Sequence, residues 1–151
     1  MCGILGILSK SKVDVNLLKK MNNSLSHRGP DGAGIVIDEN FNFGIAHRRL
    51  SILDLSDKGN QPMLSHNKQW LISFNGEIYN HKILRKELEK AGHKISWKGT
   101  SDTETLIMLI EKLGLKKTLQ NINGMFAFAL WDKQKKELFL CKDRIGEKPL
   151  Y

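Results

Sequence analysis

Two pairs of short apolar segments, each pair joined by a few polar residues, constrain the fold of this chain most strongly. The first pair covers residues 33–37 and 43–48 and turns at Asp38-Glu39-Asn40, and the second covers residues 124–131 and 137–142 and turns at residues 132–136. Both pairs predict β-hairpins. Alternating strands and helices can also form a parallel α/β sheet, but two hairpins favour antiparallel sheets covered by helices.

Further strands and the covering helices are predicted from the remaining segments. Residues 2–9 are apolar and predict a strand buried on both sides, and residues 70–74 predict a strand that ends at Asn75-Gly76. Residues 27–32 predict a loop and residues 56–69 an irregular stretch. Apolar residues at helical spacing predict helices over residues 14–25 and 81–91, and a capping box at Ser101 to Glu104 begins a third that ends at Gly114.

The second helix carries the most detailed local signals. Asn80 is expected to cap its start, and Gly92 lies where a C-terminal cap belongs. Its expected buried stripe consists of Ile83, Leu84, Leu88 and Ala91.

Composition excludes several classes of protein. A chain of 151 residues with 40% hydrophobic and 26% charged residues is typical of one globular domain. No apolar run approaches the roughly 20 residues that cross a membrane. The net charge of +8 comes from dispersed lysines, which favours solvated helix faces over a nucleic-acid surface. Two cysteines indicate no disulfide framework, so we expect a cytoplasmic protein without membrane or nucleic-acid partners.

Cys2 is the strongest candidate for chemistry. It follows Met1 directly, and small residues at this position normally permit removal of the initiator methionine. The exposed cysteine would then carry a thiol that titrates near ~8.5 and an α-amine that titrates near ~8, so the amine can accept the thiol proton. A nucleophile with an adjacent base is an established route to covalent catalysis. The alternative is a small residue that merely starts a strand.

Other polar residues suit the same chemistry. The Asn75 amide and the Gly76 backbone N–H could stabilise an oxyanion, although Asn-Gly is also the commonest tight-turn signal. The Arg49 guanidinium can pair with a substrate carboxylate. Asp102 or Glu77 can accept from a substrate ammonium, but Asp102 would also suit the first turn of any helix, and Glu77 could simply be exposed.

The histidines receive no catalytic role, and neither a metal site nor a phosphate-binding loop is predicted. His27 and His47 are given no catalytic function, because the α-amine of Cys2 already supplies a base. No Cys/His spacing predicts a metal site, and no glycine-rich phosphate loop is present in the sequence.

Taken together, the segments resemble the glutaminase domain of class II glutamine amidotransferases, within the N-terminal nucleophile hydrolases, and most closely that of glutamine-hydrolysing asparagine synthetases. The resemblance extends through the whole chain and is specific because many motifs occur in order. These motifs are Met1-Cys2-Gly3-Ile4, Ser26 to Gly32, Ala46 to Asp54, Gln61-Pro62, Phe74 to His81, Ser101 to Glu104, Gly124 to Ala129, Asp143 to Gly146 and Lys148 to Tyr151.

The resemblance implies an α+β fold, a four-layer αββα sandwich with two antiparallel sheets between helical layers. It also implies hydrolysis of L-glutamine to glutamate and ammonia, with Cys2 as nucleophile and Asn75 and Gly76 as the oxyanion hole. Arg49 would bind the substrate α-carboxylate and Asp102 the α-amine. The remaining residues implied for the glutamine pocket are Leu50, Ser51, Ile52, Leu53 and Glu77.

Members of this family continue into an ATP-dependent synthetase domain, which residues 1–151 lack. We therefore expect residues 1–151 to be the glutaminase domain of a longer protein, with no cofactor of its own and with ATP and Mg confined to the synthetase domain. That domain, in the same or a partner chain, is the expected partner, and a second copy of the chain is a further candidate. Aspartate is the first acceptor expected, and a sugar acid is the alternative. A non-catalytic docking module is the alternative function.

Overall fold

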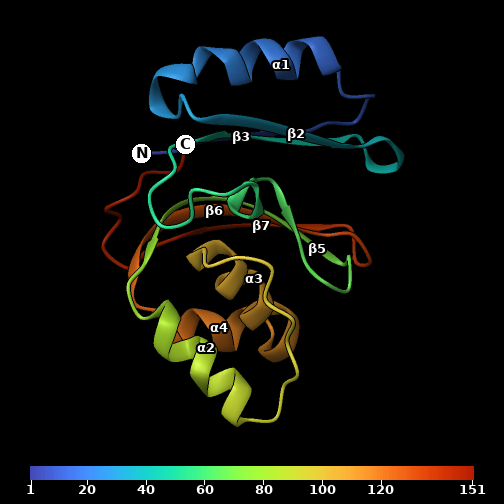
Figure 1. Ribbon diagram of the computed structural model, residues 1–151. Helices are drawn as coiled ribbons and strands as arrows, with labels where there is room; N and C mark the ends of the chain where they lie inside the picture. Colours follow the sequence, from blue (N-terminus) through green and yellow to red (C-terminus); the bar gives the residue numbers. More distant parts are fainter.

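The computed structural model describes all of residues 1–151 and arranges them in four layers, helix, sheet, sheet and helix (Figure 1). The first sheet has the strand order β1-β3-β2, formed by Gly3–Leu8, Phe43–Arg49 and Gly32–Asp38. The second has the order β4-β5-β6-β7, formed by Met63–Leu64, Trp70–Ile78, Gly124–Asp132 and Glu137–Lys142. All neighbouring strands are antiparallel, so the predicted αββα sandwich and both predicted hairpins are confirmed.

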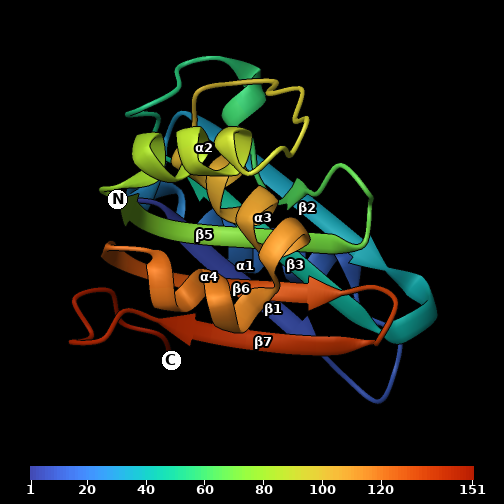
Figure 2. The ribbon, with the colours of Figure 1, turned by 90° about the horizontal axis from the view of Figure 1, so that it is seen from below.

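Helices cover the two outer faces. Helix α1, Val15–Ser24, lies on the first sheet, and helices α2, His81–Lys90, α3, Asp102–Leu113, and α4, Leu115–Asn121, lie on the second (Figures 1 and 2). Seen from the side of these three helices, the strands of the first sheet cross behind those of the second at an angle (Figure 2). Three 3₁₀ turns and irregular segments, among them residues 91–101 between α2 and α3 and residues 143–151 after β7, complete the chain.

The largest core lies between the second sheet and α3. Every residue from Asp102 to Ile110 is buried, because α3 is enclosed by the sheet on one side and by α2 and α4 on others. Its apolar residues pack against the outer, helix-covered face of β5 and β6, including Phe74, Ile78 and Phe128. Burial all round explains why this helix begins with a satisfied cap, in which the Ser101 hydroxyl accepts from the Glu104 N–H at 3.2 Å.

Between the sheets, packing is apolar at one end and polar at the other. Phe43 and Trp131 stack with ring centroids 4.5 Å apart at the apolar end. Toward the other end, the Ser73 hydroxyl donates to the Ala46 carbonyl at 3.1 Å. This hydrogen bond fixes the position of β5 in the second sheet relative to β3 in the first sheet.

Several local predictions are wrong. Strand β5 does not end at Asn75-Gly76 but continues to Ile78, and Asn75 and Gly76 pair with Ala127 and Phe126 in the ladder. The tight-turn interpretation of Asn75-Gly76 is therefore excluded. The turn signal was overridden by pairing with β6, whose start at Gly124 allows close approach of the two backbones.

Helix α2 also departs from its sequence signals. The Asn80 side chain caps no N–H of α2; its amide donates to the Asn121 carbonyl and its oxygen accepts from Asn123 N–H, which ties α2 to the end of α4. Ile83 and Ala91 are exposed, so the buried stripe is narrower than expected. Helix α4 was not predicted at all.

No helix in the structure combines the length and the apolar character that crossing a membrane requires.

Gly76 provides a test of the close approach of β5 and β6. A Cβ at this position would lie 2.2 Å from the Met125 carbonyl oxygen, so Gly76→Ala must push two backbones apart. We expect the free energy of unfolding in urea to fall by about 2 kcal/mol or more. Gly32→Ala is the control, since its Cβ would meet Arg49 Cβ at an ordinary 3.5 Å. Equal stability of the two variants would contradict this packing.

Candidate active site

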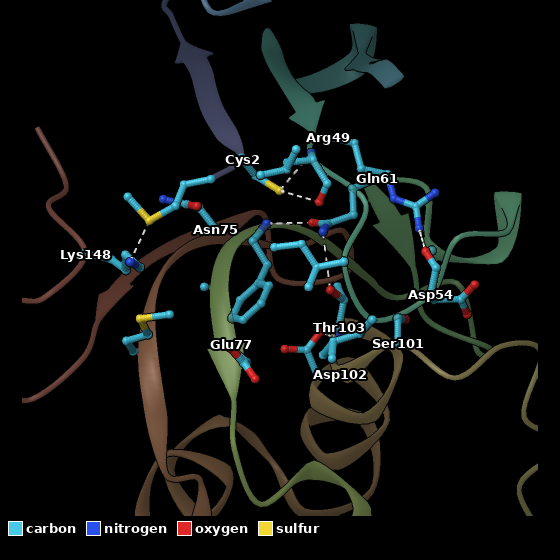
Figure 3. Close-up of a pocket in the computed structure, with 18 residues that line it drawn as sticks. Cys2, Arg49, Asp54, Gln61, Asn75, Glu77, Ser101, Asp102, Thr103 and Lys148 are labelled. Atoms are coloured by element: carbon cyan, nitrogen blue, oxygen red, sulfur yellow. Dashed lines mark hydrogen bonds between the residues drawn. The ribbon is translucent and has the colours of Figure 1, made fainter. Parts of the chain in front are cut away.

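A single pocket at the polar end of the sandwich gathers nearly all the predicted site residues (Figure 3). The predicted residues that line it are Cys2, Arg49, Leu50, Ile52, Leu53, Asn75, Gly76, Glu77 and Asp102. Ser51 does not line the pocket; its N–H donates to the Asp31 carboxylate at 2.8 Å. The pocket therefore brings together elements that are far apart in the chain, namely the start of β1, the end of β3, the end of β5 and the start of α3.

Cys2 is held rigidly at the start of β1. The Arg28 guanidinium donates to the Cys2 carbonyl at 3.1 Å, and the Leu50 N–H lies 3.4 Å from the Cys2 sulfur. Because Gly3 pairs with Arg48 in the first sheet, the backbone next to Cys2 cannot shift without breaking the ladder. The thiol in turn donates to the Leu50 carbonyl at 3.7 Å, so both backbone groups of Leu50 hold the sulfur in place.

The outer edge of β5 supplies a free backbone donor. Strand β4 covers only the first part of this edge, and beyond it side chains take over: Gln61 accepts from the Phe74 N–H at 2.7 Å and Asp102 accepts from the Ile78 N–H at 2.9 Å. Alternate residues of a strand point their N–H groups the same way. The Gly76 N–H, midway between these two, therefore points out of the same edge, and nothing in the chain accepts from it.

The Asn75 side chain completes a pair of donors. It lies on the face of β5 that also carries Ser73, toward the first sheet and Cys2 (Figure 3). Asn75 is buried, yet its amide makes no hydrogen bond within the chain and lines the pocket. The amide group itself is open to the pocket and can donate to a ligand there. Together with the Gly76 N–H, it forms a site suited to a developing oxyanion.

His47 is structural. Its ring Nε2 lies 3.1 Å from the Phe74 carbonyl, which can only accept, so Nε2 carries the proton. Burial lowers the pKa of His47 to about 4, with the nearby Arg49 acting in the same direction. The ring is thus neutral near pH 7 and joins β3 to the edge of β5. His27 is exposed and contacts the Ser24 carbonyl, outside the pocket.

Arg49 organises the loop that follows β3. Its guanidinium donates to the Ser56 carbonyl at 2.8 Å and to the Asn60 side chain at 2.9 Å, and it also reaches the Asp54 carbonyl. Three of its five N–H groups have protein partners, which leaves two, the number that a carboxylate accepts. The same loop is fastened to the segment before α3, because Asp54 accepts from the Thr100 N–H at 2.7 Å.

Two carboxyl groups form the floor of the pocket. Asp102 is 6% exposed, and burial raises its pKa to about 6 although the N–H groups of Ile78 and Thr103 oppose the shift. Glu77 lines the pocket nearby and acts in the same direction on Asp102. Burial of an acid without a cationic partner is costly, so this site is suited to a ligand that brings a positive charge.

Sequence reasoning missed several residues of the pocket. Gln61 bridges β5 and α3, since its amide also donates to the Thr103 hydroxyl at 3.3 Å. Lys148 and Met125 reach the pocket from the end of the chain and from β6. Gln61 and Lys148 both stand within the motifs that carry the family resemblance, so their position in those motifs was the available signal.

Comparisons with known proteins agree with this site. The family described as "Glutamine amidotransferase domain" matches residues 1–151. Asparagine synthetase [glutamine-hydrolyzing] 2 of Bacillus subtilis is 41% identical over the whole of this chain, and asparagine synthetase B [glutamine-hydrolyzing] of Escherichia coli is 38% identical over the whole chain. The chain spans 20% and 26% of the lengths of these two relatives.

A solved structure shares the fold. Glutamine phosphoribosylpyrophosphate amidotransferase from B. subtilis matches 93% of this chain and 37% of its own with a TM-score of 0.71 and 23% identity. The family match covers every residue, so the chain is a member of the glutamine amidotransferase domain family.

The state of Asp102 can be measured directly. We expect its carboxyl ¹³C NMR signal to titrate with a midpoint near pH 6 in the free domain, because burial disfavours the ionised form. Asp54 is the contrast, since hydrogen bonds from Ser56 and Thr100 lower its pKa to about 2. A midpoint for Asp102 close to the ordinary 3.8 would contradict the buried, unpaired geometry.

The same shift fixes the sign of a stability change. A carboxyl with a higher pKa in the folded chain binds more protons folded than unfolded, so its contribution is present below pH 3.8 and is lost as pH rises to about 6. The loss corresponds to roughly 3 kcal/mol if the unfolded value is ordinary. Urea unfolding across this pH range should show the loss in the natural chain and not in Asp102→Asn.

Proposed function

We propose that this domain hydrolyses L-glutamine to glutamate and ammonia through a glutamyl thioester on Cys2. The observation that carries the proposal is the shared pocket of the Cys2 thiol, the unpartnered Asn75 amide and Gly76 N–H, and the buried Asp102 carboxylate. The family match and the glutamine-hydrolysing relatives support it. No metal takes part in the proposed reaction.

In the first step, the Cys2 sulfur attacks the carbon of the substrate side-chain amide. A C–S bond forms and the carbonyl oxygen gains negative charge, which the Asn75 amide and the Gly76 N–H stabilise. The C–N bond then breaks and ammonia leaves with a proton. Water attacks the resulting thioester, releases glutamate and returns the proton to the thiol. Both donors are fixed in a paired strand, so little reorganisation is needed as charge develops.

The base in this scheme is the α-amine of Cys2. While Met1 is attached, the Cys2 nitrogen belongs to a peptide bond and cannot accept a proton. Removal of Met1 would create the amine next to the thiol on the same residue, where it takes the thiol proton and passes it to the leaving ammonia. His47 cannot replace it, since it is buried and committed to the Phe74 carbonyl.

The two ends of the substrate would be recognised by opposite charges. Arg49 retains two free N–H groups for the α-carboxylate, and Asp102 would pair with the α-ammonium. Ile52 and Leu53, both exposed at the pocket rim, would cover the aliphatic part of the substrate. Leu50 and Glu77 are proposed to complete the pocket lining. Ser51 is proposed to contribute only by its place in the backbone next to Leu50, since its side chain does not line the pocket.

In the whole protein, the ammonia would serve an ATP-dependent synthetase domain. The relatives are several times longer than this chain and are glutamine-hydrolysing asparagine synthetases, which supports a synthetase domain as partner and aspartate as acceptor. ATP and Mg would bind that domain and not this one. The cytoplasmic location and the absence of nucleic-acid partners stay predictions.

Cys2 is tested by a glutamine-like electrophile. Treatment of the purified chain with a diazo-ketone analogue of glutamine should add one adduct that maps to Cys2 in the chain lacking Met1. Cys2→Ala should take no adduct and lose glutaminase activity, and so should a chain with a residue retained ahead of Cys2. Cys141→Ala is the control, because Cys141 lies in β7 outside the pocket and should leave both readouts unchanged. Full activity in Cys2→Ala would overturn the proposal.

Arg49→Lys tests carboxylate recognition. We expect KM for glutamine to rise about tenfold or more with a smaller change in kcat, because lysine keeps the charge but loses the planar fork. Arg48→Lys is the matched control. Arg48 directly precedes Arg49 in β3, and its side chain faces α1 and donates to the Asn22 carbonyl. An unchanged KM in Arg49→Lys would remove Arg49 from the binding site.

A further inference from the structure

Lys148 is a buried cation with no acidic partner. Its exposed fraction is 6%, and its ammonium makes one hydrogen bond, to the thioether sulfur of Met1 at 2.6 Å. None of the ion pairs in the chain includes it. A thioether is a weak acceptor and carries no charge, so the charge of Lys148 is left uncompensated in the pocket. Buried lysines are normally paired, which makes this one unusual.

The position of Lys148 is built by a neighbouring carboxylate. Asp143 accepts from the backbone N–H groups of Phe126, Glu147 and Lys148 at 3.1, 2.9 and 3.0 Å. Burial alone would raise the pKa of Asp143, but these N–H groups outweigh it and hold the pKa at about 2. The segment that carries Lys148 is thus fastened to the start of β6, and the ammonium is presented to the pocket by a fixed backbone.

Met1 connects this cation to the nucleophile. Its thioether sulfur contacts the Lys148 ammonium, and its carbonyl carbon is bonded to the Cys2 nitrogen, so one residue links the ammonium to that nitrogen. Figure 3 shows Lys148 on the opposite side of the pocket from Asp54. Removal of Met1 would take away the one hydrogen-bond partner of the Lys148 ammonium and create the α-amine of Cys2 at the pocket that both residues line.

Other charged groups face the same space, and most are already committed. Asp54 accepts from the Thr100 N–H at 2.7 Å, and Asp102 accepts from the Ile78 N–H at 2.9 Å. Arg28 donates to the Cys2 carbonyl at 3.1 Å, and Arg49 donates to the Ser56 carbonyl in the loop after β3 at 2.8 Å. Glu77 lines the pocket without a hydrogen bond from another side chain and would favour a protonated amine. Lys148 lies on the Met1 side of the pocket, and its positive charge would favour the neutral amine instead.

We infer that Lys148 keeps the α-amine of Cys2 in its neutral, basic form near pH 7. Cys2 and Lys148 line the same pocket, and two ammonium groups there would repel each other, so one of them loses its proton at a lower pH than it would in water. The α-amine ordinarily titrates near ~8 and lysine near ~10.4, so the α-amine is the one that loses it. Lys148 thus acts through Cys2 and has no contact with the substrate in this role.

A titration of Cys2 tests this inference. The chain is prepared with Cys2 as its first residue, checked by intact mass, and labelled with ¹³C at cysteine Cα, so that Cys141 serves as an internal reference. We expect the midpoint of the Cys2 α-amine to rise by about one pH unit in Lys148→Met and in Lys148→Gln. Lys148→Arg, which keeps the charge, should leave the midpoint near that of the natural residue.

Activity gives a second readout. On the acidic side of the midpoint, kcat/KM for glutamine should fall about tenfold in the two neutral variants and recover at alkaline pH. The inference rests on the proposed function only in naming the amine as the base, and the NMR titration needs no turnover. An inactive natural chain with a low amine midpoint would therefore refute the function alone. Equal midpoints in Lys148→Met, Lys148→Gln and the natural chain would refute the role of Lys148.

Discussion

The pocket depends on the edge of β5 that β4 pairs only in part. Buried backbone N–H and carbonyl groups must find partners, and β4 is too short to supply them beyond the first residues of β5. The side chains of Gln61, His47 and Asp102 take over this task at Phe74 and Ile78. The one N–H left over belongs to Gly76. Gln61 and Asp102 join β5 to α3, and His47 joins it to β3, so the edge that holds the free donor is also the point at which the layers are fastened together.

The need to pair the backbone groups of β5 also explains why so many polar residues are buried at this end of the sandwich. His47 stays neutral because burial lowers its pKa, and Asp102 is held partly protonated near its raised pKa. Apolar side chains here would leave the buried N–H groups at the edge of β5 unpaired, which is costly. The domain thus combines the proposed oxyanion site with an acid and a lysine that have no ionic partner.

The fold was largely predictable from the sequence, and the reasons for the exceptions are physical. The two hairpins follow from alternating segments and short turns, which are local signals. Asn75-Gly76 misled because its turn signal is also local, whereas its place in β5 is decided by pairing with β6. The candidate site residues came from motif order. Lys148 was not singled out, because its contact with Met1 joins positions 147 residues apart, which no local pattern reports.

The loop after β3 has a consequence for protein engineering. Arg49 and Asp54 fasten this loop from within and to the segment before α3, while the oxyanion donors belong to a different strand. Ile52 and Leu53 are exposed on it and line the pocket, whereas Leu55 is exposed outside the pocket. In the proposed reaction, the contacts to the substrate side chain and the chemical step therefore belong to separate segments of the chain. Libraries that vary only Ile52 and Leu53 would sample new amide substrates while leaving Cys2, Asn75 and Gly76 unchanged.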